Sequence, residues 1–371
     1  MLTRRQFVRR SANVALGAGL LPVLARAASA APIAPARAHG DHFFDWRELA
    51  PGMHAALNRT GDDMTLVGGN AVLATGEGGA LLIDTKQCVL GPALRREAQS
   101  LSPAIAQVIN THHHFDHAGG NPSFGPEIPI TMHGKCWERL QNAGQANLAQ
   151  FDAKIKALAE SKLPECDAAA ADAEKFKARI PSLPANAWAD EKRVGRLSAN
   201  AMMDVAGQKV EILHVGAGHT DNDLFIFFRK HNILVTGDLV FSGLNVYFDQ
   251  QGGANSAGWL RSLRAMEKLC TDKTIVVPGH GDVGTVAAIR AQIEYFEKHI
   301  AAVEKAIAAK KSRDEVAAMT LPEYKDRPLA FALPMLMGGL YDERVPKAAP
   351  QAPERKPEST KLDPAKPSQP K

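Results

Sequence analysis

The chain has 371 residues, of which 45% are hydrophobic, enough for one large domain with a sizeable core. Its formal net charge is +4, but residues 1–30 contain five arginines and no acidic residue, so the remainder has a charge of −1. Without a basic surplus outside that segment, we expect no nucleic acid as a partner. The sequence contains no CxxC pair, so its cysteines do not predict a zinc knuckle. We expect the four cysteines to be free thiols: Cys88, Cys136, Cys166 and Cys270. A disulfide between Cys136 and Cys166 is the alternative.

Residues 1–30 have the order of parts typical of a twin-arginine export signal. Arg4 and Arg5 precede an apolar stretch from Val14 to Ala25, and Ala28-Ser29-Ala30 is a small-residue cleavage site. A membrane anchor or a cytosolic basic tail is the alternative, but the stretch is shorter than the roughly 20 residues that span a bilayer. We therefore expect a mature protein in the periplasm or outside the cell, without a stable membrane span.

The segment from Thr111 to Gly120 contains the pattern HxHxDH directly after residues 105–110, an apolar run typical of a buried strand. Two residues apart on an extended turn, His112 and His114 share one side and His113 points away. Asp116 and His117 follow on a turn into a helix and can face a second ion. A nonspecific histidine tract is the alternative, but such tracts lack an internal Asp and a preceding strand.

Residues 134–200 are rich in Ala, Lys and Glu and predict a helical insertion. Phe151, Ile155 and Leu158 are at helical spacing, and Pro181 and Pro184 mark a break. The insertion is either a packing appendage or a lid over the site.

Three further apolar runs each end at a glycine next to a candidate metal ligand. The runs at 210–215, 233–235 and 274–277 lead to His219, Asp238 and His280 respectively. Strand ends at the edge of a sheet are where α/β folds place their chemistry.

The last third of the chain offers candidate walls for a pocket. The loop that follows Asp238 contains four residues that belong either to the wall of a pocket or to the core: Phe241, Asn245, Tyr247 and Phe248. The segment from Phe331 to Leu340, with Met335 and Met337, is expected to be a buried closing element. Residues 346–371 are rich in Pro and Lys and predict a disordered tail, which leaves one domain over 31–345.

Together these motifs resemble the metallo-β-lactamase-fold hydrolases over residues 67–300. Gly69 to Leu73 and Gly79 to Thr85 are similar to the family's first strands and Asp turn. The resemblance implies an α/β fold, an αββα sandwich of two mixed sheets with the metals at one edge. It implies one ion on His112, His114 and His219, a second on Asp116, His117 and His280, Asp238 between both, and Asp84 orienting a ligand.

Classical metallo-β-lactamases usually carry Cys or Ser at the position of Asp238. The glyoxalase II, lactonase and phosphodiesterase branches carry Asp there, as this chain does. His114 stands where the flavodiiron oxidoreductases carry Glu. The resemblance thus implies two divalent ions, zinc with iron or manganese as alternatives, and a bridging hydroxide that cleaves a small ester, lactone or thioester. Asp116 and Asp238 would be its catalytic carboxylates. The alternatives are hydrolysis of β-lactams, or an exported metal-binding or redox accessory protein without turnover.

Replacing both Arg4 and Arg5 by Lys should leave a folded precursor in the cytoplasm, because the twin-arginine route requires the paired guanidinium groups. Cell fractionation and the mass of the product should show the bond between Ala30 and Ala31 intact. Normal periplasmic accumulation of the double variant contradicts the export signal.

Overall fold

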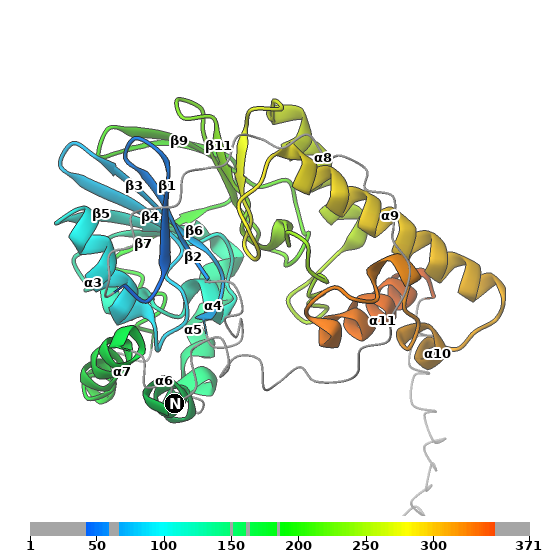
Figure 1. Cartoon of the computed structure of the whole chain (residues 1–371), viewed down its shortest axis with the longest axis horizontal. Helices are drawn as coiled ribbons and strands as arrows, with labels where there is room; N and C mark the ends of the chain where they lie inside the picture. The colour runs from blue at the N-terminus through cyan, green and yellow to red at the C-terminus, as the bar shows by residue number, and fades with distance from the viewer. Residues whose placement is uncertain (1–41, 59–66, 149–150, 161–163, 184–185, 346–371) are drawn as a thin grey trace, which may run out of the picture.

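A computed structural model describes residues 42–58, 67–148, 151–160, 164–183 and 186–345. The whole predicted export signal and the whole predicted tail lie outside the described residues. Two mixed sheets form the centre of the molecule (Figure 1). The first has the order β1-β2-β3-β4-β5-β6-β7. Its strands are β1 (Asp45–Ala50), β2 (Met53–Leu57), β3 (Ala71–Gly76), β4 (Gly79–Ile83), β5 (Ile105–Ile109), β6 (Ile130–His133) and β7 (Val194–Leu197).

The second sheet has the order β12-β11-β10-β9-β8. Its strands are β8 (Ala201–Val205), β9 (Gln208–Leu213), β10 (Phe225–Phe228), β11 (Ile233–Val235) and β12 (Ile275–Val277). Alternate residues along a strand face the same side, so β9 directs Val210 and Ile212 inward, where they are fully buried. They join a core shared with Val72, Leu81 and Ile109 of the first sheet. Burial of these apolar side chains holds the two sheets face to face.

Helices cover the outer face of each sheet, and the predicted αββα sandwich is confirmed (Figure 1). The first sheet carries α3 (Gly91–Leu101), α5 (Gly134–Leu148), α6 (Phe151–Glu160) and α7 (Pro164–Lys177). The second carries α8 (Ser256–Leu269) and α9 (Val286–Ala308), while α11 (Leu333–Arg344) packs against α9 and α10 (Arg313–Ala317) packs against α11. No helix among the described residues is long and apolar enough to cross a membrane.

The predicted insertion contains α5, α6 and α7, but its last part is not helical. Phe151, Ile155 and Leu158 are buried on one side of α6, as their spacing predicts. Residues 194–197 instead form β7, which pairs parallel to β6 and extends the first sheet. Pro181 lies in the short 3-10 helix η2 (Ile180–Ser182), and Pro184 is outside the described residues.

The C-terminal closing element is α11, with Leu336, Met337 and Leu340 fully buried. The prediction was wrong for Phe331 and Met335 within that segment, because Phe331 is 58% exposed and Met335 is 38% exposed. Phe331 precedes α11 in the 3-10 helix η5 (Ala330–Ala332), after Leu329 in the left-handed backbone region. None of the four cysteines, which all lie among the described residues, forms a disulfide, and Cys270 is only half-buried.

The topology brings the candidate ligands to one edge of the sandwich. β4 pairs parallel to β5, and β11 pairs parallel to β12, so the carboxyl ends within each pair coincide. Asp84 and the HxHxDH loop follow β4 and β5, whereas Asp238 and His280 follow β11 and β12. Each sheet therefore contributes half of the site.

Candidate metal centre

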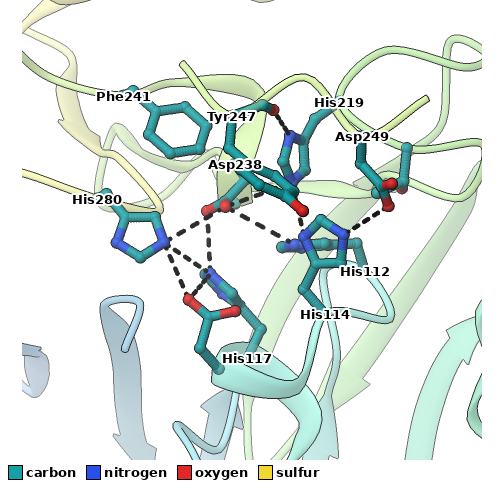
Figure 2. Close-up of polar contacts among 12 residues, drawn as sticks. His112, His114, His117, His219, Asp238, Phe241, Tyr247, Asp249 and His280 are labelled. Carbon is teal, nitrogen blue, oxygen red and sulfur yellow. Dashed lines mark hydrogen bonds and ion pairs between the residues drawn. The ribbon is translucent and has the colours of Figure 1, made fainter. Parts of the chain in front are cut away.

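The seven predicted ligands meet in two adjoining clusters. Figure 2 labels all of them except Asp116. One contains His112, His114, His219 and Asp238, and the other contains Asp116, His117 and His280. Within each cluster the potential ligand atoms lie within 4.8 Å of one another. Two ligand sets of this composition suit zinc, iron or manganese.

Asp238 contacts both clusters through its two carboxylate oxygens. Oδ1 lies 2.9 Å from His117 Nε2. Oδ2 lies 3.4 Å from His219 Nε2 and 3.4 Å from His280 Nε2. Only 4% of its side chain is exposed. This is the placement expected of a carboxylate shared by two ions.

The first cluster brings His114 Nδ1 to 2.9 Å from His219 Nε2. His112 Nε2 lies 3.8 Å from Asp238 Oδ2, is buried, and has no hydrogen-bond partner among the described residues. A buried imidazole nitrogen left without a partner is costly, and a metal ion would satisfy it. In the second cluster, His280 Nε2 lies 3.1 Å from Asp116 Oδ2. The donor set therefore fits two divalent ions.

Four imidazoles are oriented by hydrogen bonds at the nitrogen that faces away from the clusters. His117 Nδ1 lies 2.8 Å from Asp84 Oδ2, and His114 Nε2 lies 2.8 Å from Asp249 Oδ2. His219 Nδ1 donates to the backbone carbonyl of Tyr247 over 2.9 Å, and His112 Nδ1 lies 3.0 Å from the Thr111 hydroxyl. Such contacts fix which nitrogen is available to a metal.

Asp84 also accepts hydrogen bonds from the backbone N–H and the hydroxyl of Thr111, both over 2.8 Å. It thus holds the start of the HxHxDH loop as well as His117, which fits the orienting role that the resemblance implies. Asp249 was missed by the sequence analysis. It lies in a loop 135 residues after His114, and no motif there distinguishes it.

His113 lies beside the seven ligands but faces other partners. Its Nδ1 is 2.9 Å from Asn222 Nδ2, and its backbone N–H donates to Asn222 Oδ1 over 3.0 Å. Its Nε2 is 3.9 Å from Asp249 Oδ2. His113 belongs to neither cluster, but with His114 and Asp249 it forms a further group whose potential ligand atoms lie within 4.8 Å of one another. That His113 is not needed for metal binding stays a prediction.

The charges of the metal-free centre divide unevenly between the clusters. Burial favours the neutral form of His280, but the adjacent Asp238 and Asp116 raise its pKa to about 9. The pKa of His117 also lies well above its usual value despite burial, because Asp238, Asp116 and Asp84 surround it. Burial and the neighbouring His114 instead lower the pKa of His219 to about 3. Protons thus occupy the second cluster when metal is absent.

Two glycines allow backbone to approach the ligands closely. A Cβ atom at Gly279 would lie 1.9 Å from Asp238 Oδ1, and one at Gly69 would lie 2.1 Å from His117 Cε1. Neither position has room for a side chain, which explains why these ligand-bearing turns are rich in glycine.

A cavity of about 450 Å³ opens on the two clusters. Phe241 and Tyr247 line it, whereas Asn245 and Phe248 are buried in the core. The insertion also forms part of its wall, through Phe151 and Lys154 of α6. Its lining residues are Gln87, Cys88, Val89, His114, Phe115, Asp116, Phe151, Lys154, Asp238, Phe241, Tyr247, His280, Leu329 and Phe331.

Comparison with known proteins identifies one family model, that of the metallo-beta-lactamase superfamily, over residues 64–133. The metallo-beta-lactamase type 2 of Bacillus cereus is 30% identical over 94 residues, 25% of this chain and 37% of that protein. The probable metallo-hydrolase YqjP of Bacillus subtilis (strain 168) is 28% identical over 247 residues, 61% of this chain and 71% of YqjP. The solved structure of DIM-1 metallo-beta-lactamase is 18% identical, with a TM-score of 0.47 over 69% of this chain and 97% of DIM-1.

The chain matches only about 37% of the length of the two Bacillus lactamases. The matched family model nevertheless covers the whole HxHxDH loop, which contains four of the seven candidate ligands: His112, His114, Asp116 and His117. Since the two mixed sheets, their outer helices and the clustered ligands all conform to that family, the chain has the fold of the metallo-β-lactamase superfamily.

Proposed function

We propose that this protein is a dinuclear metal-dependent hydrolase that is exported and cleaves a small ester, lactone or thioester. The observation that carries the proposal is the position of Asp238, whose two oxygens contact ligands of both clusters. Zinc is the preferred ion, with iron or manganese as alternatives. The expected partner is a small molecule rather than a nucleic acid. Export to the periplasm or beyond rests on the sequence of residues 1–30.

Two divalent ions at this site would supply an activated water at neutral pH and polarise the substrate carbonyl. His112, His114 and His219 would hold one ion, Asp116, His117 and His280 the other, and Asp238 both. Asp116 lines the cavity and is 26% exposed, so its carboxylate can accept a hydrogen bond from the attacking water. Water oxygen bonds to the acyl carbon, the C–O or C–S bond breaks, and a proton goes to the leaving group.

Hydrolysis of β-lactams is the second candidate, favoured by the match to the Bacillus cereus enzyme over 94 residues. The negative charge of Asp238 favours hydrolysis of an ester over hydrolysis of a β-lactam. A carboxylate between two ions neutralises more of their charge than a neutral residue would, which leaves less to stabilise the nitrogen anion formed when an amide opens. Esters and thioesters need less help for their leaving groups.

Asp238→Ala should remove at least one of about two metal ions per chain and lower turnover about a thousandfold or more, equivalent to about 4 kcal/mol in the barrier. The matched control is Asp282→Ala, because Asp282 lies two residues after His280 but is 76% exposed. Elemental analysis and hydrolysis of an aryl ester, a lactone, a thioester and a cephalosporin measure both effects. Full activity with one tightly held ion contradicts the dinuclear site. A cephalosporin kcat/KM about tenfold above the others favours the lactamase.

His114→Ala should lose the first ion, whereas His113→Ala should keep both, because His113 bonds Asn222 instead. Asp249→Asn should weaken metal binding by about tenfold to a hundredfold, since its hydrogen bond to a candidate ligand is at the nitrogen of His114 that faces away from the first cluster. Competition with a chromophoric chelator measures all three variants. If His113→Ala loses as much metal as His114→Ala does, the assignment of His114 rather than His113 as a ligand of the first ion is wrong.

Metal affinity should rise with pH up to about 9. In the metal-free protein the raised pKa values of His280, at about 9, and of His117 keep both imidazoles protonated at neutral pH. A metal must displace these protons, so acidification weakens binding and binding at pH 7 releases protons. Calorimetry in buffers of different ionisation enthalpy counts the protons released. An affinity that stays constant between about pH 6 and pH 8 would contradict this charge distribution.

A further inference from the structure

We propose that the substrate carries an apolar chain beside its scissile ester or thioester bond, and that Leu329 and Phe331 bind this chain. The inference rests on the proposed hydrolase function and names the class of substrate, an ester or thioester of an apolar acid, alcohol or thiol. Phe331 would be a specificity-determining residue, because it contacts a part of the substrate that does not react.

The cavity wall is apolar outside the metal centre. Fourteen residues line the cavity, and four of them are candidate metal ligands. The other ten, except Gln87 and Lys154, carry an apolar side chain, an aromatic ring or, at Cys88, a thiol. The Lys154 ammonium donates a hydrogen bond to the Gln87 side-chain oxygen. Because apolar surface gains free energy when it leaves water, this wall favours a ligand with an apolar chain over a sugar or a phosphate.

Phe331 is an exposed aromatic residue of this wall. It is 58% exposed although it lines the cavity. Among the described residues, the other exposed large hydrophobic side chains are those of Met202 and Met335, and neither lines the cavity. Single exposed apolar residues are ordinary on protein surfaces, but a ring at the wall of an apolar cavity stays in contact with water until a ligand covers it. Because the cavity opens on the metal centre, we infer that this ligand is the substrate.

Hydrogen bonds hold the segment that carries Phe331 at the cavity. Asn245 is buried and donates to the carbonyl of Pro328 twice, from its backbone N–H over 3.0 Å and from its side-chain amide over 3.2 Å. Leu329 follows with a φ of 63°, in the left-handed region that a leucine rarely adopts. Its carbonyl accepts a hydrogen bond from Ala332 N–H over 2.9 Å, which closes the turn. This fixed turn places both Leu329 and Phe331 on the cavity wall.

Two aromatic rings connect the apolar wall to the metal centre (Figure 2). Phe241 stacks on His280, with ring centroids 5.2 Å apart and an angle of 14° between the planes. Tyr247 meets His114 edge to face, with ring centroids 5.7 Å apart. Both rings also line the cavity, so apolar surface begins directly beside the candidate ligands. A substrate with its scissile carbonyl at the metal centre therefore has the rest of its length against apolar side chains.

The apolar chain can lie on either side of the scissile bond. On the acyl side it stays on the acid product, and on the other side it leaves with the alcohol or thiol. In both cases the water oxygen bonds to the acyl carbon, the C–O or C–S bond breaks, and the leaving oxygen or sulfur takes a proton.

The test compares three esters that differ in the position of the chain. Ethyl acetate is the short reference, whereas ethyl hexanoate and hexyl acetate are isomers with the chain on the acyl side and on the alcohol side. In the zinc-loaded wild-type protein, at least one isomer should show a kcat/KM about tenfold or more above the reference, because each buried CH₂ group contributes roughly threefold to fourfold. The faster isomer identifies the side that the chain occupies. The three corresponding thioesters form a second set.

Phe331→Ser should lower the ratio of kcat/KM between the faster isomer and the short reference about fivefold, because the ring no longer covers the chain. Phe331→Leu should keep most of the ratio. Met335→Ser is the matched control, because Met335 is an apolar residue with 38% exposure, four positions later, that does not line the cavity. It should leave the ratio unchanged.

Binding of N-phenyl-1-naphthylamine, an uncharged apolar dye, provides a readout independent of turnover. Fluorescence titration should give a dissociation constant about tenfold weaker for Phe331→Ser than for the wild-type protein, and an unchanged one for Met335→Ser. Equal affinity of the wild-type protein and Phe331→Ser contradicts the apolar site.

Two failures are distinguishable. If the wild-type protein hydrolyses none of these esters and thioesters, nor the lactone and cephalosporin probes, the proposed hydrolase function fails, whereas weaker dye binding by Phe331→Ser still supports the apolar site. If it hydrolyses only the cephalosporin, prefers neither chain-bearing isomer, or loses activity equally on all three esters in Phe331→Ser, the substrate class named here is overturned and the hydrolase remains.

Discussion

Asp238 is almost completely removed from water and lies between imidazoles that belong to different parts of the chain. A carboxylate in such a place requires positive charge close by, and its burial would otherwise be costly. In the metal-free protein, protons on His117 and His280 supply that charge. Metal ions would supply more of it and would also engage the unpartnered His112 nitrogen. The centre is therefore arranged for cations, and its other contacts serve to orient ligands toward them.

The same carboxylate links the two halves of the sandwich. Asp238 follows β11 of the second sheet, whereas His117 belongs to the loop that follows β5 of the first. Gly279 sits against Asp238, and Gly69 sits against His117. Any shift of one sheet along the other would separate Asp238 from His117, so the apolar packing between the sheets is a condition for the site.

The fold and the meeting of the seven candidate ligands could be predicted from sequence because each of these residues follows an apolar strand that ends at a turn, and that pattern is local. The contacts of Asp249 and Lys154 could not, because they depend on how distant loops and helices pack. Asp249 meets His114 across 135 residues, and Lys154 reaches the cavity only through the rotation of α6. Phe331 shows the opposite error. Its apolar neighbours suggested burial, but η5 leaves its ring exposed at the cavity.

The cavity wall is built from two kinds of segment, strand ends of the two-sheet core and peripheral helices and loops. The ligands sit on strand ends that the two-sheet core holds in register, whereas Phe151, Lys154, Leu329 and Phe331 come from α6 and the segment before α11. Those segments can change in sequence, or be replaced, while the strand ends stay where they are. Substrate preference in this molecule can therefore diverge independently of metal chemistry, so relatives with the same seven ligands need not share a substrate.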